Sequence, residues 1–138
     1  MSDAVTTVIF ACVHNAGRSQ MAGAFFNALA DPAKARAVSA GTQPVERVHP
    51  EVVSVMREVG IDLADVAPRR LTDELAAGAR LLVTMGCGEE CPVLPGLRRD
   101  DWEVQDPKGQ PLERVRAIRD DVRRRIIALV DANGWRRS

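Results

Sequence analysis

The chain has 138 residues, of which 46% are hydrophobic and 28% charged, and its 19 basic residues balance its 19 acidic ones. This length fits a single domain (residues 1–138) with a core of its own, and the neutral charge gives no reason to expect nucleic acid or an acidic membrane surface as the main partner. There is no signal-like N-terminus and no apolar run of membrane-spanning length, so we expect a cytoplasmic protein.

Hydrophobic patterning divides the chain into alternating strands and helices. A strand is predicted where a short run is β-branched and apolar, as in residues 6–11. A helix is predicted where apolar side chains recur at helical spacing, as at Met21, Phe25 and Leu29. In chain order the predicted elements are strand 6–11, helix 18–30, strand 35–40, helix 50–60, helix 72–77, strand 80–85, strand 101–105 and a long helix from 111 to the turn at 133–134.

Strands that alternate with helices predict an α/β fold, in which a parallel sheet is covered by helices on both faces. Ligands of such sheets bind in the loops that leave the carboxyl ends of the strands. The residues capable of chemistry fall in three such loops: residues 12–18, 87–91 and 106–107. The sequence therefore predicts one functional site, built from loops at one edge of the sheet.

The first of these loops has the pattern Cys12-x5-Arg18 between a strand and a helix. A loop at a helix start turns backbone N–H groups toward one point, which suits a tetrahedral oxyanion, and Arg18 can donate two hydrogen bonds to two anion oxygens. The same positive field is expected to lower the pKa of the Cys12 thiol and make it a nucleophile. The residues expected to bind the oxyanion are Val13, His14, Asn15, Ala16, Gly17, Arg18 and Ser19.

Two features of this loop have alternative interpretations. The Cys-x5-Arg pattern is short, so a buried cysteine followed by a helix-start arginine would also produce it. The side chain of His14 is as consistent with a solvated position as with proton transfer, whereas Ser19 is placed to donate its hydroxyl to the Cys12 sulfur. The strand before the loop and the helix after it favour the catalytic interpretation.

Asp106, followed by Pro107, comes after the last predicted strand, on a loop that can fold over the first one. Displacement of an oxyanion at sulfur benefits from a carboxylic acid that protonates the departing oxygen, and Asp106 is the candidate. The alternative is a turn-forming Asp-Pro pair, which is common in loops.

Cys87 and Cys91 follow another strand, with Gly86 and Gly88 making the segment deformable. Two cysteines at this spacing can bridge if the segment is turned. The alternatives are a structural metal clip or two unconnected thiols. Because zinc requires four ligands and only two are local, no metal is predicted. An odd number of cysteines also fits redox chemistry in a reducing compartment better than a secreted disulfide framework.

Four motifs together resemble arsenate reductases of the low-molecular-weight protein tyrosine phosphatase superfamily: CVHNAGRSQMA, VSAGT, TMGCGEECP and the Asp-Pro pair at 106–107. The resemblance covers essentially the whole chain and implies a four-stranded parallel sheet with flavodoxin-like winding. It also implies that Cys12 attacks arsenate held by the loop and Arg18, while Asp106 assists the departing oxygen. The protein would then serve arsenic resistance, as a detoxifying enzyme.

In thioredoxin-linked members of this superfamily, a second cysteine attacks the nucleophile and a third takes over the disulfide. The resemblance implies that Cys87 releases arsenite by forming a Cys12–Cys87 disulfide, and that Cys91 converts it to Cys87–Cys91, which thioredoxin reduces. No tightly bound cofactor is implied, and arsenate, phosphate or sulfate can occupy the loop. Cys87 and Cys91 are closer together in sequence than the corresponding pair of the best-known members.

Three alternatives remain open from the sequence. A tyrosine phosphatase would use Cys12, Arg18 and Asp106 alone, although the chain has no Tyr and so lacks the tyrosines that usually follow the acid in such phosphatases. An arsenate reductase that uses mycothiol or glutathione with a mycoredoxin or glutaredoxin-like partner would require Cys12 but neither of the other cysteines. A non-enzymatic arsenite or metal sensor would need an effector element that the sequence does not show.

Overall fold

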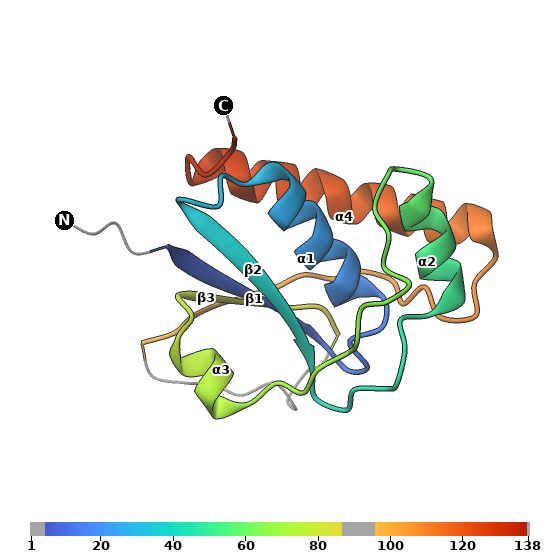
Figure 1. The fold of residues 1–138 in the computed structure, drawn as a ribbon, viewed down its shortest axis with the longest axis horizontal. Coiled ribbons are helices and arrows are strands. Elements are labelled where there is room, and N and C mark those ends of the chain that lie inside the picture. The colour runs from blue at the N-terminus through green and yellow to red at the C-terminus, as the bar shows by residue number, and fades with distance from the viewer. Residues whose placement is uncertain (1–4, 87–95, 138) are drawn as a thin grey trace.

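The computed structural model describes residues 5–86 and 96–137 and contains one parallel sheet of four strands (Figure 1). The strands lie in the order β2-β1-β3-β4, so β1 is central. Their bounds are β1 Thr6–Cys12, β2 Ala35–Gly41, β3 Leu81–Thr84 and β4 Arg98–Asp101. The helices are α1 Arg18–Leu29, α2 Pro50–Arg57, α3 Asp73–Ala77 and α4 Leu112–Ala132.

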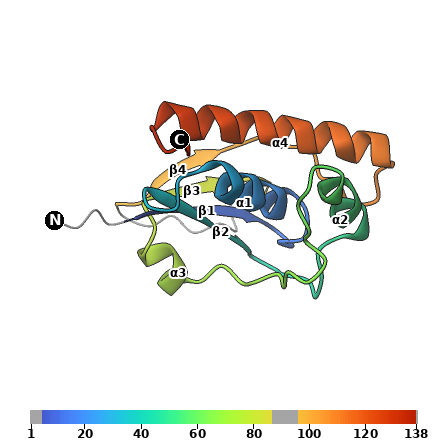
Figure 2. The same cartoon turned by 45° about the horizontal axis from the view of Figure 1, so that its top comes forward.

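Helices cover both faces of the sheet. Figure 2 shows α1, α2 and α4 on one face and the short α3 on the other. Successive side chains of a strand point to opposite faces, so Phe10 and Cys12 belong to the larger core, whereas Ala11 packs with Ala76 of α3. Because β1 is buried on both faces, its carboxyl end is a rigid position, and Cys12 is its last residue.

The helix ends follow the expected local chemistry. Pro50 occupies the first turn of α2, where its missing N–H costs no hydrogen bond. The hydroxyl of Thr72 caps α3 by accepting a hydrogen bond of 3.1 Å from the Leu75 N–H. The predicted helix starts at Pro50 and Thr72 are thereby confirmed.

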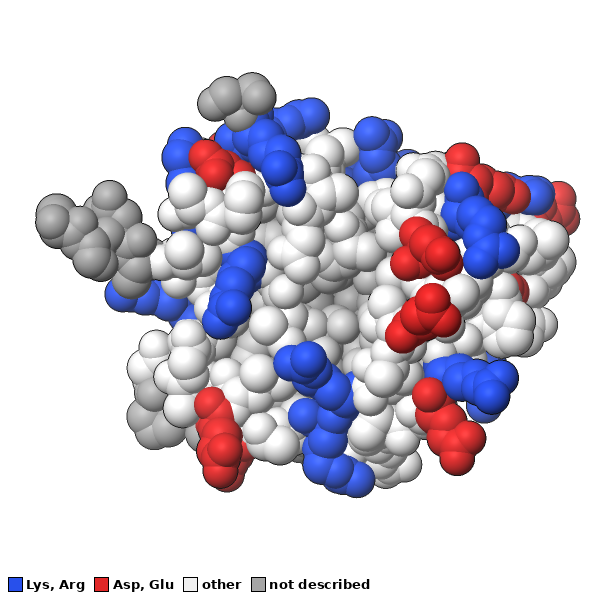
Figure 3. All heavy atoms as spheres, viewed as in Figure 1, with Lys and Arg blue, Asp and Glu red and all other residues white. Residues whose placement is uncertain are grey.

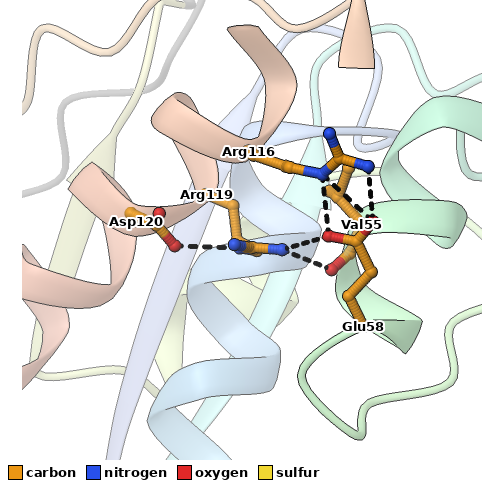
Figure 4. A network of polar contacts seen from close by, with 5 residues as sticks. All are labelled: Val55, Glu58, Arg116, Arg119 and Asp120. Atoms are coloured by element: carbon orange, nitrogen blue, oxygen red, sulfur yellow. Dashed lines mark hydrogen bonds and ion pairs between the residues drawn. The ribbon is translucent and has the colours of Figure 1, made fainter. Parts of the chain in front are cut away.

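A network of charged groups ties α2 to α4 (Figure 4). Arg119, whose side chain is largely buried, donates to the Val55 carbonyl and to Glu58, both at 2.9 Å. Arg116 donates to both carboxylate oxygens of Glu58, at 3.0–3.1 Å from Nε and 2.8 Å from Nη2. The hydrogen bonds from these two arginines hold the pKa of Glu58 below its ordinary value.

The fourth strand is the one element that the sequence misplaces. It was predicted at residues 101–105, but β4 spans Arg98–Asp101 and pairs in parallel with β3, from Leu81↔Arg98 to Thr84↔Asp101. This edge strand keeps its charged side chains mostly exposed, so it carries no hydrophobic signal. The apolar residues that suggested a strand, Trp102 and Val104, instead pack on the core after the strand has ended.

Charges of both signs share the surface, as their equal numbers lead one to expect. Figure 3 shows Lys and Arg interspersed with Asp and Glu on the face in view. Among the described residues, no helix is long and apolar enough to cross a bilayer.

Candidate active site

The loop that connects β1 to α1 surrounds the nucleophile candidate. Cys12 ends β1 and is 3% exposed, and Arg18 is the first residue of α1. The Cys12 sulfur lies 2.9 Å from the hydroxyl oxygen of Ser19. The end of a buried strand and the first turn of a helix therefore fix the two ends of the loop.

The carbonyl oxygens of this loop are all turned toward the rest of the protein. The carbonyls of residues 12, 13, 14 and 16 accept hydrogen bonds from backbone N–H groups of the segment 42–49. Those of residues 15 and 17 accept from α1, through the Gln20 side chain and the Met21 N–H. Within the part of the chain that the structure describes, the N–H groups of residues 13–18 donate to no other backbone group. The loop thus presents donors rather than acceptors to its centre, as an anion site requires.

Asn15 is the buried anchor of the loop. It has a φ of 52° and is fully buried, and its side-chain oxygen accepts from the Arg69 N–H at 2.8 Å and the Gln20 amide at 3.1 Å. Its Nδ2 donates to the Ser19 hydroxyl oxygen at 2.8 Å. Because that oxygen already accepts from Asn15, the hydroxyl hydrogen of Ser19 is available to the sulfur of Cys12.

Arg18 is held from three sides. Its Nη1 donates to the Val104 carbonyl at 3.2 Å, and its Nη2 lies 3.7 Å from the carboxylate of Asp106. Gly86, with a φ of +95°, lies so close that a Cβ at that position would overlap the guanidinium. The absence of a side chain at Gly86 therefore makes room for Arg18.

The loop with the acid candidate folds over the oxyanion loop. Asp106 accepts a hydrogen bond of 3.0 Å from the Lys108 N–H, and its side chain is 48% exposed. Pro107 lies against Gly17: a Cβ on Gly17 would approach Pro107 Cγ to 2.8 Å. The absence of a side chain at Gly17 lets Pro107 approach. The structure thus brings Asp106 beside Arg18, across a long separation in sequence.

The other two predicted cysteines, Cys87 and Cys91, lie outside the described residues. The nearest described residue is Gly86, which contacts Arg18 as stated above. Among the residues that the structure does describe, no three His, Cys, Asp or Glu side chains are grouped so as to hold a metal ion.

His49 belongs to this site, and the sequence analysis did not identify it. Its backbone N–H donates to the Ala16 carbonyl at 2.9 Å, and its half-buried ring lies 6.5 Å from that of His14, at an interplanar angle of 78°. Burial lowers the pKa of His49, as do the charges of Lys108 and His14, whereas Glu51 and Asp106 oppose the shift. The sequence offers no local signal for this position, because a hydrogen bond between distant segments creates it.

Comparison with known proteins places this site in context. The model of the family described as low molecular weight phosphotyrosine protein phosphatase matches residues 7–134. The chain is 38% identical over 136 residues to a putative arsenate reductase of Halobacterium salinarum, with 94% of each chain covered. It is 33% identical over 126 residues to a protein of Synechocystis sp. named glutaredoxin arsenate reductase, covering 89% of this chain and 95% of the relative.

A solved structure of an arsenate reductase is also similar to this chain. The thioredoxin-dependent arsenate reductase of Corynebacterium glutamicum superposes with a TM-score of 0.82 at 35% identity, covering 96% of this chain. The match spans 63% of the length of that Corynebacterium chain. The predicted four-stranded fold is thereby confirmed. Since the family model matches nearly the whole sequence, the chain belongs to the low molecular weight phosphotyrosine protein phosphatase family.

Proposed function

We propose that this protein reduces arsenate to arsenite, with Cys12 as the nucleophile. The observation that carries the proposal is the loop itself: its carbonyls accept hydrogen bonds from the surrounding protein, its N–H groups donate to no other backbone group that the structure describes, and Arg18 is held beside it. Relatives in Halobacterium, Synechocystis and Corynebacterium bear the name arsenate reductase, which supports arsenate over other tetrahedral anions as the substrate.

In the proposed first step, the Cys12 thiolate attacks As(V) and forms an S–As bond. One arsenate oxygen departs as water, with Asp106 as the acid that protonates it. Arg18 and the loop N–H groups neutralise the remaining oxygens, and the Ser19 hydroxyl stabilises the thiolate before attack. The side chain of Asp106 is both beside Arg18 and half-exposed, which suits a group that must regain its proton from solvent.

In the proposed second step, the Cys87 thiolate attacks the Cys12 sulfur. The S–S bond forms as the S–As bond breaks, and its electron pair stays on arsenic, which leaves as arsenite. Cys91 then attacks Cys87, frees Cys12 and leaves a Cys87–Cys91 disulfide. The two electrons come from two thiols, and reduction of the final disulfide restores them. No bound cofactor is required in this scheme.

Thioredoxin is the proposed reductant of that disulfide. The Corynebacterium neighbour is thioredoxin-dependent, and a relay through Cys87 and Cys91 would yield a disulfide suited to such a partner. The Synechocystis relative is named for glutaredoxin, so a glutaredoxin-like or mycoredoxin-like partner is the alternative.

A phosphatase is the second candidate, because the family description names one and because Cys12, Arg18 and Asp106 would suffice for it. A phosphatase has no need of Cys87 or Cys91. Cleavage of p-nitrophenyl phosphate at a rate unaffected by their replacement would therefore separate that activity from the reductase.

The test is arsenate-dependent NADPH oxidation with thioredoxin and thioredoxin reductase, and in parallel with glutathione and glutaredoxin. We expect Cys12→Ser, Cys87→Ser and Cys91→Ser all to lose multiple turnover with thioredoxin, whereas the exposed Ser54→Ala control retains it. If only Cys12→Ser is inactive, the relay is wrong and a small-thiol reductase is the better description. If no variant or reductant gives arsenate turnover but p-nitrophenyl phosphate is hydrolysed, the protein is a phosphatase.

A further inference from the structure

The chain contains two histidines, and their ring centroids lie 6.5 Å apart. His14 belongs to the loop itself, and His49 is joined to it by the hydrogen bond to the Ala16 carbonyl. Histidine is the one side chain whose unperturbed pKa places its charge change between about pH 5 and 8. The groups best suited to titrate near neutrality are thus gathered at this one site.

The His49 ring lies next to both the oxyanion loop and the loop that carries Asp106 and Pro107. A Cβ on Gly17 would lie 3.6 Å from Cδ2 of the His49 ring and 2.8 Å from Cγ of Pro107. The ring therefore meets the oxyanion loop and the Asp106-Pro107 loop at one point. Both histidines are partly exposed, so their rings can exchange protons with solvent.

We propose that the imidazoles of His14 and His49 form an outer binding element for the substrate oxyanion, which attracts the anion when they are protonated. Arg18 and the loop N–H groups carry a fixed charge pattern, whereas the two imidazoles add positive charge at the entrance as the pH falls. Burial lowers the pKa of His49, so its ring gains its proton at a lower pH than an ordinary histidine does.

The charged groups around His49 set the size of this response. Asp106 and Glu51 favour its protonated form, and Lys108 and His14 disfavour it. An oxyanion in the loop adds further negative charge on the side of Asp106. Because linkage is reciprocal, protonation of the histidines should strengthen anion binding by the same factor by which the anion strengthens protonation.

The inference rests on the oxyanion site proposed above, and sulfate provides a test that does not depend on turnover. Sulfate remains a dianion over this whole pH range, unlike arsenate or phosphate. Cys12→Ser provides the background, because it removes a thiol whose own titration would change the affinity. We expect calorimetry at constant ionic strength to show sulfate binding about three- to tenfold tighter at about pH 5.5 than at pH 8.

Matched variants assign this slope to the histidines. In the same background, His14→Asn and His49→Asn should each flatten the dependence of affinity on pH, and the double variant should abolish it. Asp106→Asn should shift the affinity upward at every pH and reduce the slope without abolishing it, because Asp106 favours the protonated form of His49. A slope that persists in the double histidine variant, or that vanishes in Asp106→Asn, would overturn the inference.

Proton NMR tests the reciprocal effect in protein that keeps both histidines. The Cys12→Ser protein has two sets of imidazole resonances, which His14→Asn assigns. Saturating sulfate should raise the pKa of both imidazoles, and unchanged pKa values would overturn the inference. If this protein binds no sulfate at any pH, the proposed oxyanion site fails as well. If it binds sulfate with constant affinity, only the role of the histidines fails.

Discussion

The Cys12 sulfur and the Ser19 hydroxyl oxygen lie 2.9 Å apart in a buried environment. Since Asn15 already donates to that oxygen, Ser19 can give its hydrogen to the thiolate. We expect Ser19→Ala to slow alkylation of Cys12 by iodoacetamide about tenfold or more, because hydrogen bonds to charged groups contribute about 1.5–3 kcal/mol. Mass spectrometry of the Cys12 peptide measures this rate, with Ser54→Ala as the control. Equal alkylation rates would show that the hydroxyl does not act on the sulfur.

Asn15 combines a left-handed backbone with three side-chain hydrogen bonds, and two substitutions separate these contributions. Asn15→Gly keeps the backbone conformation but loses the side-chain bonds, whereas Asn15→Ala loses both. We expect each to destabilise the fold by about 2 kcal/mol or more, because buried polar partners are left unpaired. Asn15→Ala should cost a further 1–2 kcal/mol or so for its positive φ.

Urea unfolding followed by tryptophan fluorescence measures both Asn15 variants. If the two variants are equally stable, the left-handed conformation of residue 15 does not constrain the loop.

Gly86 and Gly96 provide a matched pair for the role of Arg18. Both have positive φ, +95° and +81°, but a Cβ at Gly86 would overlap the Arg18 guanidinium, whereas a Cβ at Gly96 would meet none of the described residues within 4 Å. Alanine at either position should cost a similar 1–2 kcal/mol or so of stability. We expect Gly86→Ala alone to weaken sulfate or phosphate binding, by about tenfold or more, because Arg18 is displaced. Equal affinity in the two variants, measured by calorimetry, would contradict this.

Glu58 should make stability depend on pH. Hydrogen bonds from Arg116 and Arg119 lower its pKa from the ordinary value of 4.5. A carboxyl with a lower pKa in the folded chain stabilises the fold fully above its unfolded value, and this contribution disappears as the pH falls through the folded value. Glu58→Gln should therefore be less stable than wild type at pH 7, and its stability should fall less steeply below about pH 4.5.

Denaturant unfolding across this pH range tests the Glu58 prediction. Glu46→Gln serves as the control, because Glu46 is exposed and belongs to neither α2 nor α4. A parallel pH dependence in Glu58→Gln and wild type would mean that the link between α2 and α4 does not depend on ionisation of Glu58.

The elements that hydrophobic patterning predicted correctly are those that bury a regular face. β1 and α1 were predicted within one residue of their observed ends, so the position of the Cys12 loop followed from the sequence. The fourth strand was misplaced because β4 is an edge strand held by backbone pairing with β3. Such pairing requires no hydrophobic side chains, so the charged sequence of β4 does not indicate a strand. Hydrophobic patterning detects elements that bury side chains, so it does not detect a strand whose side chains are exposed.

The same limit applies to the site. Cys12 and Arg18 are close in sequence, so their local pattern sufficed to place them. The proximity of Asp106 to Arg18 could be suspected only from the topology, and His49 could not be found at all. The contact of Asn15 with Arg69 was also unpredictable, since it depends on how a distant loop passes the site. Cys87 and Cys91 remain predictions.

The segment 42–49 holds the oxyanion loop through its own backbone N–H groups. Any residue other than proline carries such a group, so substitutions at the exposed positions of this segment, such as Glu46 and Arg47, should be widely tolerated. A change in the length of the segment should be poorly tolerated, because one inserted or deleted residue would move its N–H donors away from the loop carbonyls that accept from them. In evolution, the number of residues in this stretch should therefore stay constant even where its exposed side chains vary, and engineered insertions should be directed elsewhere.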